Sequence, residues 1–217
     1  MRVSHVGEDA QARLNESHAC IIGVGALGCV SADLLARAGV GTITIIDRDL
    51  VERSNLHRQP LVTETDADAK RPKALAARDR LLAANSESTI HARIADFGPG
   101  NAMDLINHTG SPPDVLIDGT DNFSTRYLIN DCSVKLGIPY IYGGAIATSG
   151  AAAVFTPKTG PCLRCLHPDP PGPGTQPTCQ TAGVLAPVSS IIASYQAAEA
   201  MKVLMGQHDR VMKSMLS

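Results

Sequence analysis

The stretch that decides the fold reads Cys20-Ile-Ile-Gly-Val-Gly-Ala-Leu-Gly-Cys29 and continues to Ile43-Thr-Ile-Ile-Asp47. Its first apolar run predicts a buried strand, and glycines and a helical pattern separate it from a second apolar run that ends in an acid. The order predicted is therefore strand, glycine turn, helix and strand. The glycines of the turn are Gly23, Gly25 and Gly28.

This unit favours nucleotide binding. Glycines let the backbone approach a phosphate closely, and the N-terminus of the following helix offers unpaired N–H groups and a partial positive charge. Asp47, at the tip of the second strand, is placed to accept hydrogen bonds from ribose hydroxyls. The unit alone does not distinguish a dinucleotide from ATP, and a glycine turn that only packs a helix on the sheet is the structural alternative.

Length and composition set further bounds. The chain has 217 residues, which fits one α/β domain over residues 1–217. A net charge of −2 and an aromatic content of 3% argue against a nucleic-acid partner. No apolar run approaches the ~20 residues of a membrane span, and residues 1–16 lack the apolar core of a signal peptide. We therefore expect a cytoplasmic protein with reduced cysteines and no membrane partner.

Polar segments follow the predicted strands. Residues 49–59 come after the second strand, where Asn55 and Arg58 could reach a phosphate or a purine ribose, with a solvated connector as the alternative. Arg71-Pro-Lys73 opens a helix that is predicted to run to about Ala84. Lys73 is a phosphate ligand or a surface lysine, and composition alone favours the surface lysine.

The second half predicts a mixed sheet. A strand over 115–117 leads to Asp121, which could hold Mg²⁺ or, with its neighbour Asn122, cap the helix predicted over 123–136. Strands over 138–143, ending in glycines, and 151–156 lie too close together for a βαβ repeat. We predict a Rossmann-like α/β fold, in which antiparallel strands extend a parallel sheet and helices cover both faces.

A loop rich in proline and glycine spans about 158–181 and is expected to be long and exposed. Within it, Cys162 and Cys165 have the spacing of a zinc knuckle, and Cys179 follows. Structural zinc takes four ligands, so this zinc site is incomplete on spacing, and a redox dithiol is the alternative. The remaining cysteines look like small core residues: Cys20, Cys29 and Cys132.

Taken together, the motifs resemble the ThiF/MoeB/HesA family, the bacterial relatives of ubiquitin-activating enzymes. The resemblance covers almost the whole chain, and its specificity comes from the order of motifs that are individually weak. The motifs are Gly23-Val-Gly-Ala-Leu-Gly28, Asp47-Arg-Asp49, Ser54-Asn-Leu-His-Arg-Gln59, Arg71-Pro-Lys73, Thr120-Asp-Asn122, Cys162-Leu-Arg-Cys165 and Thr178-Cys-Gln-Thr-Ala-Gly-Val184.

The resemblance implies a homodimeric adenylyltransferase that uses ATP and Mg²⁺. Such enzymes activate the C-terminal Gly-Gly carboxylate of a ubiquitin-like sulfur carrier, such as ThiS or MoaD, as an acyl-adenylate with release of pyrophosphate. The product serves sulfur transfer in thiamine or molybdopterin biosynthesis, with a sulfurtransferase or cysteine desulfurase as a further partner. Two alternatives stay open: a carrier-binding member with impaired catalysis, and an NAD-binding oxidoreductase, against which no Tyr-x-x-x-Lys pair is found.

The resemblance also implies roles for individual residues. Asp47 would hold the ribose, Asp121 would bind Mg²⁺, and Cys179 matches a cysteine that can link to the carrier. Arg58, Lys73, Asp121 and Cys179 form the implied catalytic set. The implied nucleotide-binding set is Gly23, Gly25, Ala26, Gly28, Asp47, Asp49, Ser54, Asn55, Leu56, His57, Arg58, Lys73, Asp121 and Asn122.

Two family features are not found in this sequence. One is the N-terminal Arg-Tyr-x-Arg-Gln segment, whose arginine reaches the ATP site of the partner subunit. The other is a second Cys-x-x-Cys, which completes the zinc site in the members that have one. These two departures bear on zinc binding, for which Cys162 and Cys165 are the visible ligands, on the trans-acting arginine and on full activity.

Overall fold

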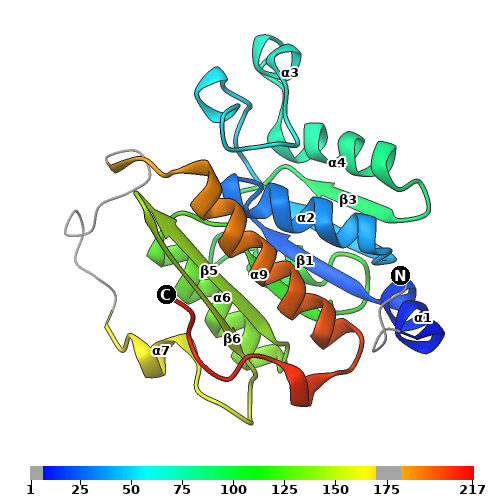
Figure 1. The fold of residues 1–217 in the computed structure, drawn as a ribbon, viewed down its shortest axis with the longest axis vertical. Coiled ribbons are helices and arrows are strands. Elements are labelled where there is room, and N and C mark those ends of the chain that lie inside the picture. Colours follow the sequence, from blue (N-terminus) through cyan, green and yellow to red (C-terminus); the bar gives the residue numbers. More distant parts are fainter. Residues whose placement is uncertain (1–6, 170–181) are drawn as a thin grey trace.

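One mixed sheet runs through the part of the chain that the computed structural model describes, residues 7–169 and 182–217 (Figure 1). Its strands, in chain order, are β1 (His18–Ile22), β2 (Thr42–Ile46), β3 (Thr89–Arg93), β4 (Val115–Asp118), β5 (Tyr140–Ile146) and β6 (Ser149–Phe155). Across the sheet the order is β3-β2-β1-β4-β5-β6. All neighbours are parallel except β5 and β6, which are antiparallel, so the predicted mixed sheet is confirmed.

Helices cover both faces of this sheet (Figure 1). The described helices are α1 (Glu8–Glu16), α2 (Ala26–Ala38), α3 (Glu64–Asp68), α4 (Lys73–Ala84), α5 (Ala102–Ile106), α6 (Phe123–Leu136), α7 (Leu163–Leu166) and α9 (Ala186–Leu204), with short 3-10 turns η1 (Arg53–Asn55) and η2 (His208–Arg210). One apolar cluster joins the sheet to α2, α4 and α9. A second joins its other face to α5, α6 and α7. The Rossmann-like expectation is therefore confirmed.

The sheet order places a crevice at the carboxyl ends of its central strands. From β1 the chain passes through α2 to β2 on one side, while β4 lies on the other side of β1. Open α/β sheets bind ligands where the strand order reverses in this way. Helices α4 and α6 have the predicted bounds. Gly39, with φ of 90°, caps the end of α2, and the side chain of Asn122 caps the start of α6.

Two expectations for the second half differ from the structure. Strand β5 does not end at its glycines but passes through Gly143 and Gly144 to Ile146. A Cβ at Gly143 would overlap the side chain of Gln196 in α9, so this glycine makes room for a helix rather than a turn. The loop expected over 158–181 contains the short helix α7, which buries Leu163. Residues 170–181, with Cys179, lie outside the described part of the chain.

The cysteines expected in the core are there. Cys20, Cys29 and Cys132 are buried, and burial raises the pKa of the Cys20 and Cys29 thiols to about 12. These two thiols are therefore protonated at neutral pH and unreactive. Within residues 7–169 and 182–217, the structure contains no helix that combines the length and the apolar character needed to cross a bilayer.

His18 predicts how stability depends on pH. It is 8% exposed at the start of β1, and burial, with a smaller contribution from His108, lowers its pKa from 6.5 to about 4. Below pH 6.5 His18 takes up a proton in the unfolded chain but stays neutral in the folded chain. The free energy of unfolding therefore has its full value above about pH 6.5 and decreases as the pH falls toward 4. At about 1.4 kcal/mol per pKa unit, the loss is roughly 3 kcal/mol.

Urea unfolding between pH 7.5 and 4.5 measures this effect. We expect His18→Gln, which keeps a polar group near Thr44 Oγ1, to flatten most of the acid-side slope in the free energy of unfolding. Burial also lowers the pKa of His108, so a small slope of the same sign should remain. Equal slopes in the two proteins would contradict the assignment to His18.

Candidate functional site

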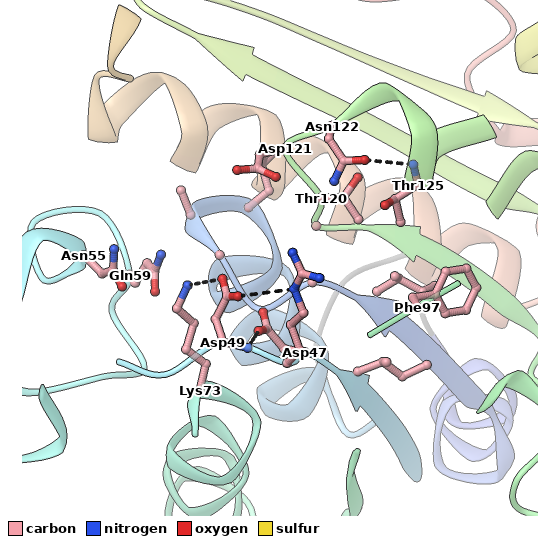
Figure 2. Close-up of a pocket in the computed structure, with 18 of the residues that line it drawn as sticks. Asp47, Asp49, Asn55, Gln59, Lys73, Phe97, Thr120, Asp121, Asn122 and Thr125 are labelled. Atoms are coloured by element: carbon pink, nitrogen blue, oxygen red, sulfur yellow. Dashed lines mark hydrogen bonds and ion pairs between the residues drawn. The ribbon is translucent and has the colours of Figure 1, made fainter. Parts of the chain in front are cut away.

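A cavity of about 970 Å³ lies at the carboxyl ends of β1, β2 and β4. The glycine turn after β1 and the segment after β4 both line it, and Lys73 of α4 reaches it from below in Figure 2. Ile22, Ile46 and Phe97 add an apolar wall. Most of the nucleotide-site residues inferred from the sequence line the cavity: Gly23, Gly25, Ala26, Asp47, Asp49, Asn55, Arg58, Lys73, Asp121 and Asn122.

Close backbone contacts form the floor of this cavity. Gly23 has φ of +89°, and a Cβ there would lie 2.7 Å from the carbonyl oxygen of Gly119. A Cβ at Gly28 would overlap the carbonyl oxygen of Gly23. Gly28 does not line the cavity. It lets the first turn of α2 pack directly on the glycine turn.

Asp47 holds the glycine turn in place. Its Oδ2 accepts a hydrogen bond from Val24 N at 2.7 Å, and its Oδ1 accepts one from Asp49 N at 2.8 Å. Burial raises the pKa of the Asp47 carboxyl, although these backbone donors oppose the shift. Its assignment to ribose stays a prediction, and the structure adds a second role for the same carboxylate.

Lys73 is buried, so its interpretation as a surface lysine is wrong. The Lys73 side chain is 9% exposed, and its Nζ donates to Asp49 Oδ2 at 2.9 Å (Figure 2). The Lys73 amide also donates to the Asp49 carbonyl oxygen at 2.9 Å. Asp49 therefore fixes both ends of the residue that opens α4, and a cation faces the cavity at a defined position.

The polar segment after β2 places only part of its motif at the cavity. Asn55 is buried, and Arg58 is held by a hydrogen bond from its Nη1 to the Ser54 carbonyl oxygen at 2.9 Å. Leu56 packs instead against a small apolar cluster beneath the segment. The motif residues that do not line the cavity are Ser54, Leu56 and His57.

Asp121 and Asn122 divide the two roles that the sequence left open. Asn122 Oδ1 accepts a hydrogen bond from Thr125 N at 2.9 Å and so caps α6. Asp121 is exposed on the wall of the cavity opposite Lys73 (Figure 2). Its carboxylate is available for a cation, which keeps the Mg²⁺ assignment as a prediction.

Sequence reasoning missed several residues of the site. Gln59 is 3% exposed and lines the cavity, and among the described residues its Oε1 has no hydrogen-bond partner. At the rim, Arg48 Nη1 donates to Asp96 Oδ2 at 2.9 Å. Gln59 was the last residue of a quoted motif, so a signal existed. Nothing in the sequence pointed to Asp96, which follows the next strand.

The residues of the cavity fit ATP and Mg²⁺. Lys73 and Arg58 supply positive charge for phosphates, and the start of α2 supplies backbone N–H groups. Mg²⁺ prefers oxygen ligands, which Asp121 provides at the same cavity. The buried Oε1 of Gln59 offers an acceptor that a bound ligand could satisfy.

Cys162 and Cys165 lie away from this cavity. Their Sγ atoms are 3.8 Å apart at the start of α7. In the described part of the chain, no group of three or more histidine, cysteine, aspartate or glutamate side chains could hold a metal ion. The described residues therefore provide two of the four ligands that structural zinc needs, and they do not form a complete zinc site.

Solved structures share this fold. Escherichia coli MccB superposes with a TM-score of 0.77 at 23% identity, covering 91% of this chain and 59% of that one. PaaA superposes with a TM-score of 0.77 at 24% identity, covering 96% of this chain and 63% of that one. At these identities the similarity establishes the fold.

Relatives in sequence are more similar. The chain is 42% identical to the sulfur carrier protein ThiS adenylyltransferase of Bacillus subtilis, over 93% of this chain and 58% of that protein. It is 41% identical to the sulfur carrier protein adenylyltransferase of Thermus thermophilus, over 95% of this chain and 76% of that protein. The chain thus spans little more than half the length of the B. subtilis relative. The profile of the ThiF family matches residues 1–217, and the chain belongs to this family.

Proposed function

We propose that the chain is an ATP-dependent adenylyltransferase acting on the C-terminal Gly-Gly carboxylate of a ubiquitin-like sulfur carrier. The observation that carries this proposal is the meeting of the glycine turn, Lys73 and Asp121 in one cavity. The printed names of the B. subtilis and T. thermophilus relatives support the same reaction. The products would be the carrier adenylate and pyrophosphate.

The chemistry needs positive charge at the cavity. A carboxylate that attacks the α-phosphate approaches a group of its own sign, so cations and fixed N–H donors lower the barrier. In this chain Lys73 and Arg58 would bind the phosphates, and the backbone at the start of α2 would donate to them. Bound Mg²⁺ would neutralise phosphate charge, with Asp121 as its protein ligand.

Partners and pathway belong to the same proposal. The Mycobacterium tuberculosis relative, 40% identical, is named a probable adenylyltransferase/sulfurtransferase, which supports sulfur transfer after adenylylation. We propose a ThiS-like or MoaD-like carrier, hence thiamine or molybdopterin biosynthesis, and a homodimer working in the cytoplasm. A covalent link at Cys179 stays a prediction from the resemblance.

ATP–pyrophosphate exchange tests the proposed reaction. With a panel of Gly-Gly carrier proteins, we expect exchange that depends on one carrier and falls about 100-fold in Asp121→Ala, because the metal loses its protein carboxylate. Asp104→Ala removes an exposed carboxylate of α5 that does not line the cavity, and it should exchange like the wild type.

The assay also separates the alternatives. ATP binding without exchange on any carrier would favour the carrier-binding member with impaired catalysis. Binding of a nicotinamide cofactor in place of ATP would overturn the adenylyltransferase. Equal rates of ATP–pyrophosphate exchange in Asp121→Ala and the wild type would contradict the role of Asp121 as the Mg²⁺ ligand, but not the proposed reaction.

A further inference from the structure

A buried ion pair lies behind the wall of the cavity that carries Asp121. Asp118, the last residue of β4, is fully buried, and Arg126 of α6 is 7% exposed. The Nε atom of Arg126 lies 3.4 Å from Asp118 Oδ2. Neither side chain lines the cavity, so neither is placed to touch a ligand there.

The pair anchors Thr120 through all of its polar groups. Asp118 Oδ1 accepts hydrogen bonds from the Thr120 amide at 2.9 Å and from Thr120 Oγ1 at 2.7 Å. Arg126 Nη2 donates to the Thr120 carbonyl oxygen at 3.0 Å. Thr120 lines the cavity and directly precedes Asp121, so these bonds fix the backbone from which the Asp121 carboxylate projects.

The core holds the pair in turn. The Tyr140 hydroxyl donates to Asp118 Oδ2 at 2.8 Å, and Gln196 Nε2 of α9 donates to the Asp118 carbonyl oxygen at 2.8 Å. The guanidinium of Arg126 lies over the rings of Phe123 and Tyr142, with 5.2 Å and 5.4 Å between its central carbon and the ring centroids. Both charged groups therefore have defined positions.

A contribution to folding stability is a weak explanation for the buried ion pair of Asp118 and Arg126. Removing both ions from water costs free energy that their attraction often fails to recover, and well-packed apolar residues serve stability at least as well. Arg126 Nε has no hydrogen-bond partner among the described residues, so the pair is not fully compensated. In this structure, however, the carboxylate of Asp118 and the guanidinium of Arg126 together bond all three polar groups of Thr120.

We propose that Asp118 and Arg126 are positioning residues that fix Thr120 and thereby aim the carboxylate of Asp121 at Mg²⁺. This inference rests on the proposed function, because it assigns a purpose to the Asp121 wall of the same site. Groups that orient a metal-binding side chain typically change metal affinity 10–100-fold when they are removed.

Arg126→Lys tests the inference. Lysine keeps a positive charge opposite Asp118, but it lacks the planar fork that reaches Asp118 and the Thr120 carbonyl oxygen together. We expect about tenfold faster amide hydrogen exchange over residues 119–122 in the protein without nucleotide. We also expect the Mg²⁺ concentration for half-maximal ATP binding to rise about tenfold, while ATP binding without metal stays the same.

Arg164→Lys is the matched control. Arg164 also pairs with a carboxylate, Asp131, and lies over an aromatic ring, that of Tyr127 at 4.8 Å, but it is remote from the cavity. It should change neither measurement. If Arg126→Lys does not fold, Tyr140→Phe removes one bond to Asp118 and should move both measurements in the same direction by smaller factors.

The outcomes separate this inference from the proposed function. If the wild type binds ATP, the inference would be overturned by an Arg126→Lys variant in which amide hydrogen exchange over residues 119–122 and the Mg²⁺ dependence of ATP binding are both unchanged. If Arg126→Lys weakened ATP binding equally with and without Mg²⁺, the inference would also be overturned, because the loss of affinity would then not depend on the metal. A wild type that binds no ATP would overturn the proposed function. The rates of amide hydrogen exchange would still decide whether Asp118 and Arg126 anchor Thr120.

Discussion

Replacing Lys73 with methionine should lower carrier-dependent ATP–pyrophosphate exchange by about a thousandfold. Lys73 is a buried cation held at the cavity by Asp49, and its removal leaves the Asp49 carboxylate facing the incoming phosphates without its partner. Losing one fixed group that stabilises developing charge costs about 10² to 10³ in rate, and the exposed negative charge adds to that cost. Exchange at saturating ATP and carrier measures the effect.

A matched variant controls for the loss of one lysine. Lys135→Met removes an exposed lysine near the end of α6 that does not line the cavity, and it should exchange at the wild-type rate. Asp49→Asn with Lys73→Met removes the uncompensated carboxylate as well and should recover part of the lost rate. A Lys73→Met variant within threefold of the wild type would show that Lys73 serves stability rather than the reaction.

Gly28→Ala should be the most destabilising of these substitutions. Alanine usually favours a helix by about 1 kcal/mol over glycine, but the added Cβ would overlap the backbone carbonyl of Gly23. Backbone cannot move aside as a flexible side chain does, so we expect a net loss of about 3 kcal/mol. For a domain of this size, that loss lowers the melting temperature by about 10 °C.

Gly100→Ala provides the comparison for thermal unfolding. A Cβ at Gly100 would meet no atom within 4 Å, so this variant should melt close to the wild type. A melting temperature for Gly28→Ala within about 2 °C of the Gly100→Ala value would show that α2 does not pack on the glycine turn as described.

Local patterns predicted most of the strands and the longer helices, but not the short helices α3 and α7. The apolar runs that became β1 and β2 and the glycines between them have a period and spacing that few other structures share. The helix predicted over 123–136 has those same bounds in α6. Strand β5 was predicted to end at Gly143, since glycine often interrupts strands. The side chain that requires a glycine there is that of Gln196, which lies 53 positions away in the chain.

The site was less accessible to sequence reasoning, because its properties depend on burial. A lysine in a helix rich in charged residues looks exposed, but the Lys73 side chain is 9% exposed and pairs with Asp49 of the segment after β2. The pair of Asp118 and Arg126 was missed for the same reason, since each residue alone is typical of a strand end or a helix surface. The resemblance to a family identified Lys73 where composition did not.

The contact among Gly23, Gly28 and Gly119 also has a consequence for how the proposed ligand site could be redesigned. Two segments, the turn over residues 23–28 and the residues after β4, meet there through backbone atoms, so this contact has no side chain that could be exchanged to suit another ligand. The rim, in contrast, offers the side chains of Arg48, Asp96 and Arg58, which can vary in length and charge. A library confined to these rim positions would keep the fold intact while it explored new substrates.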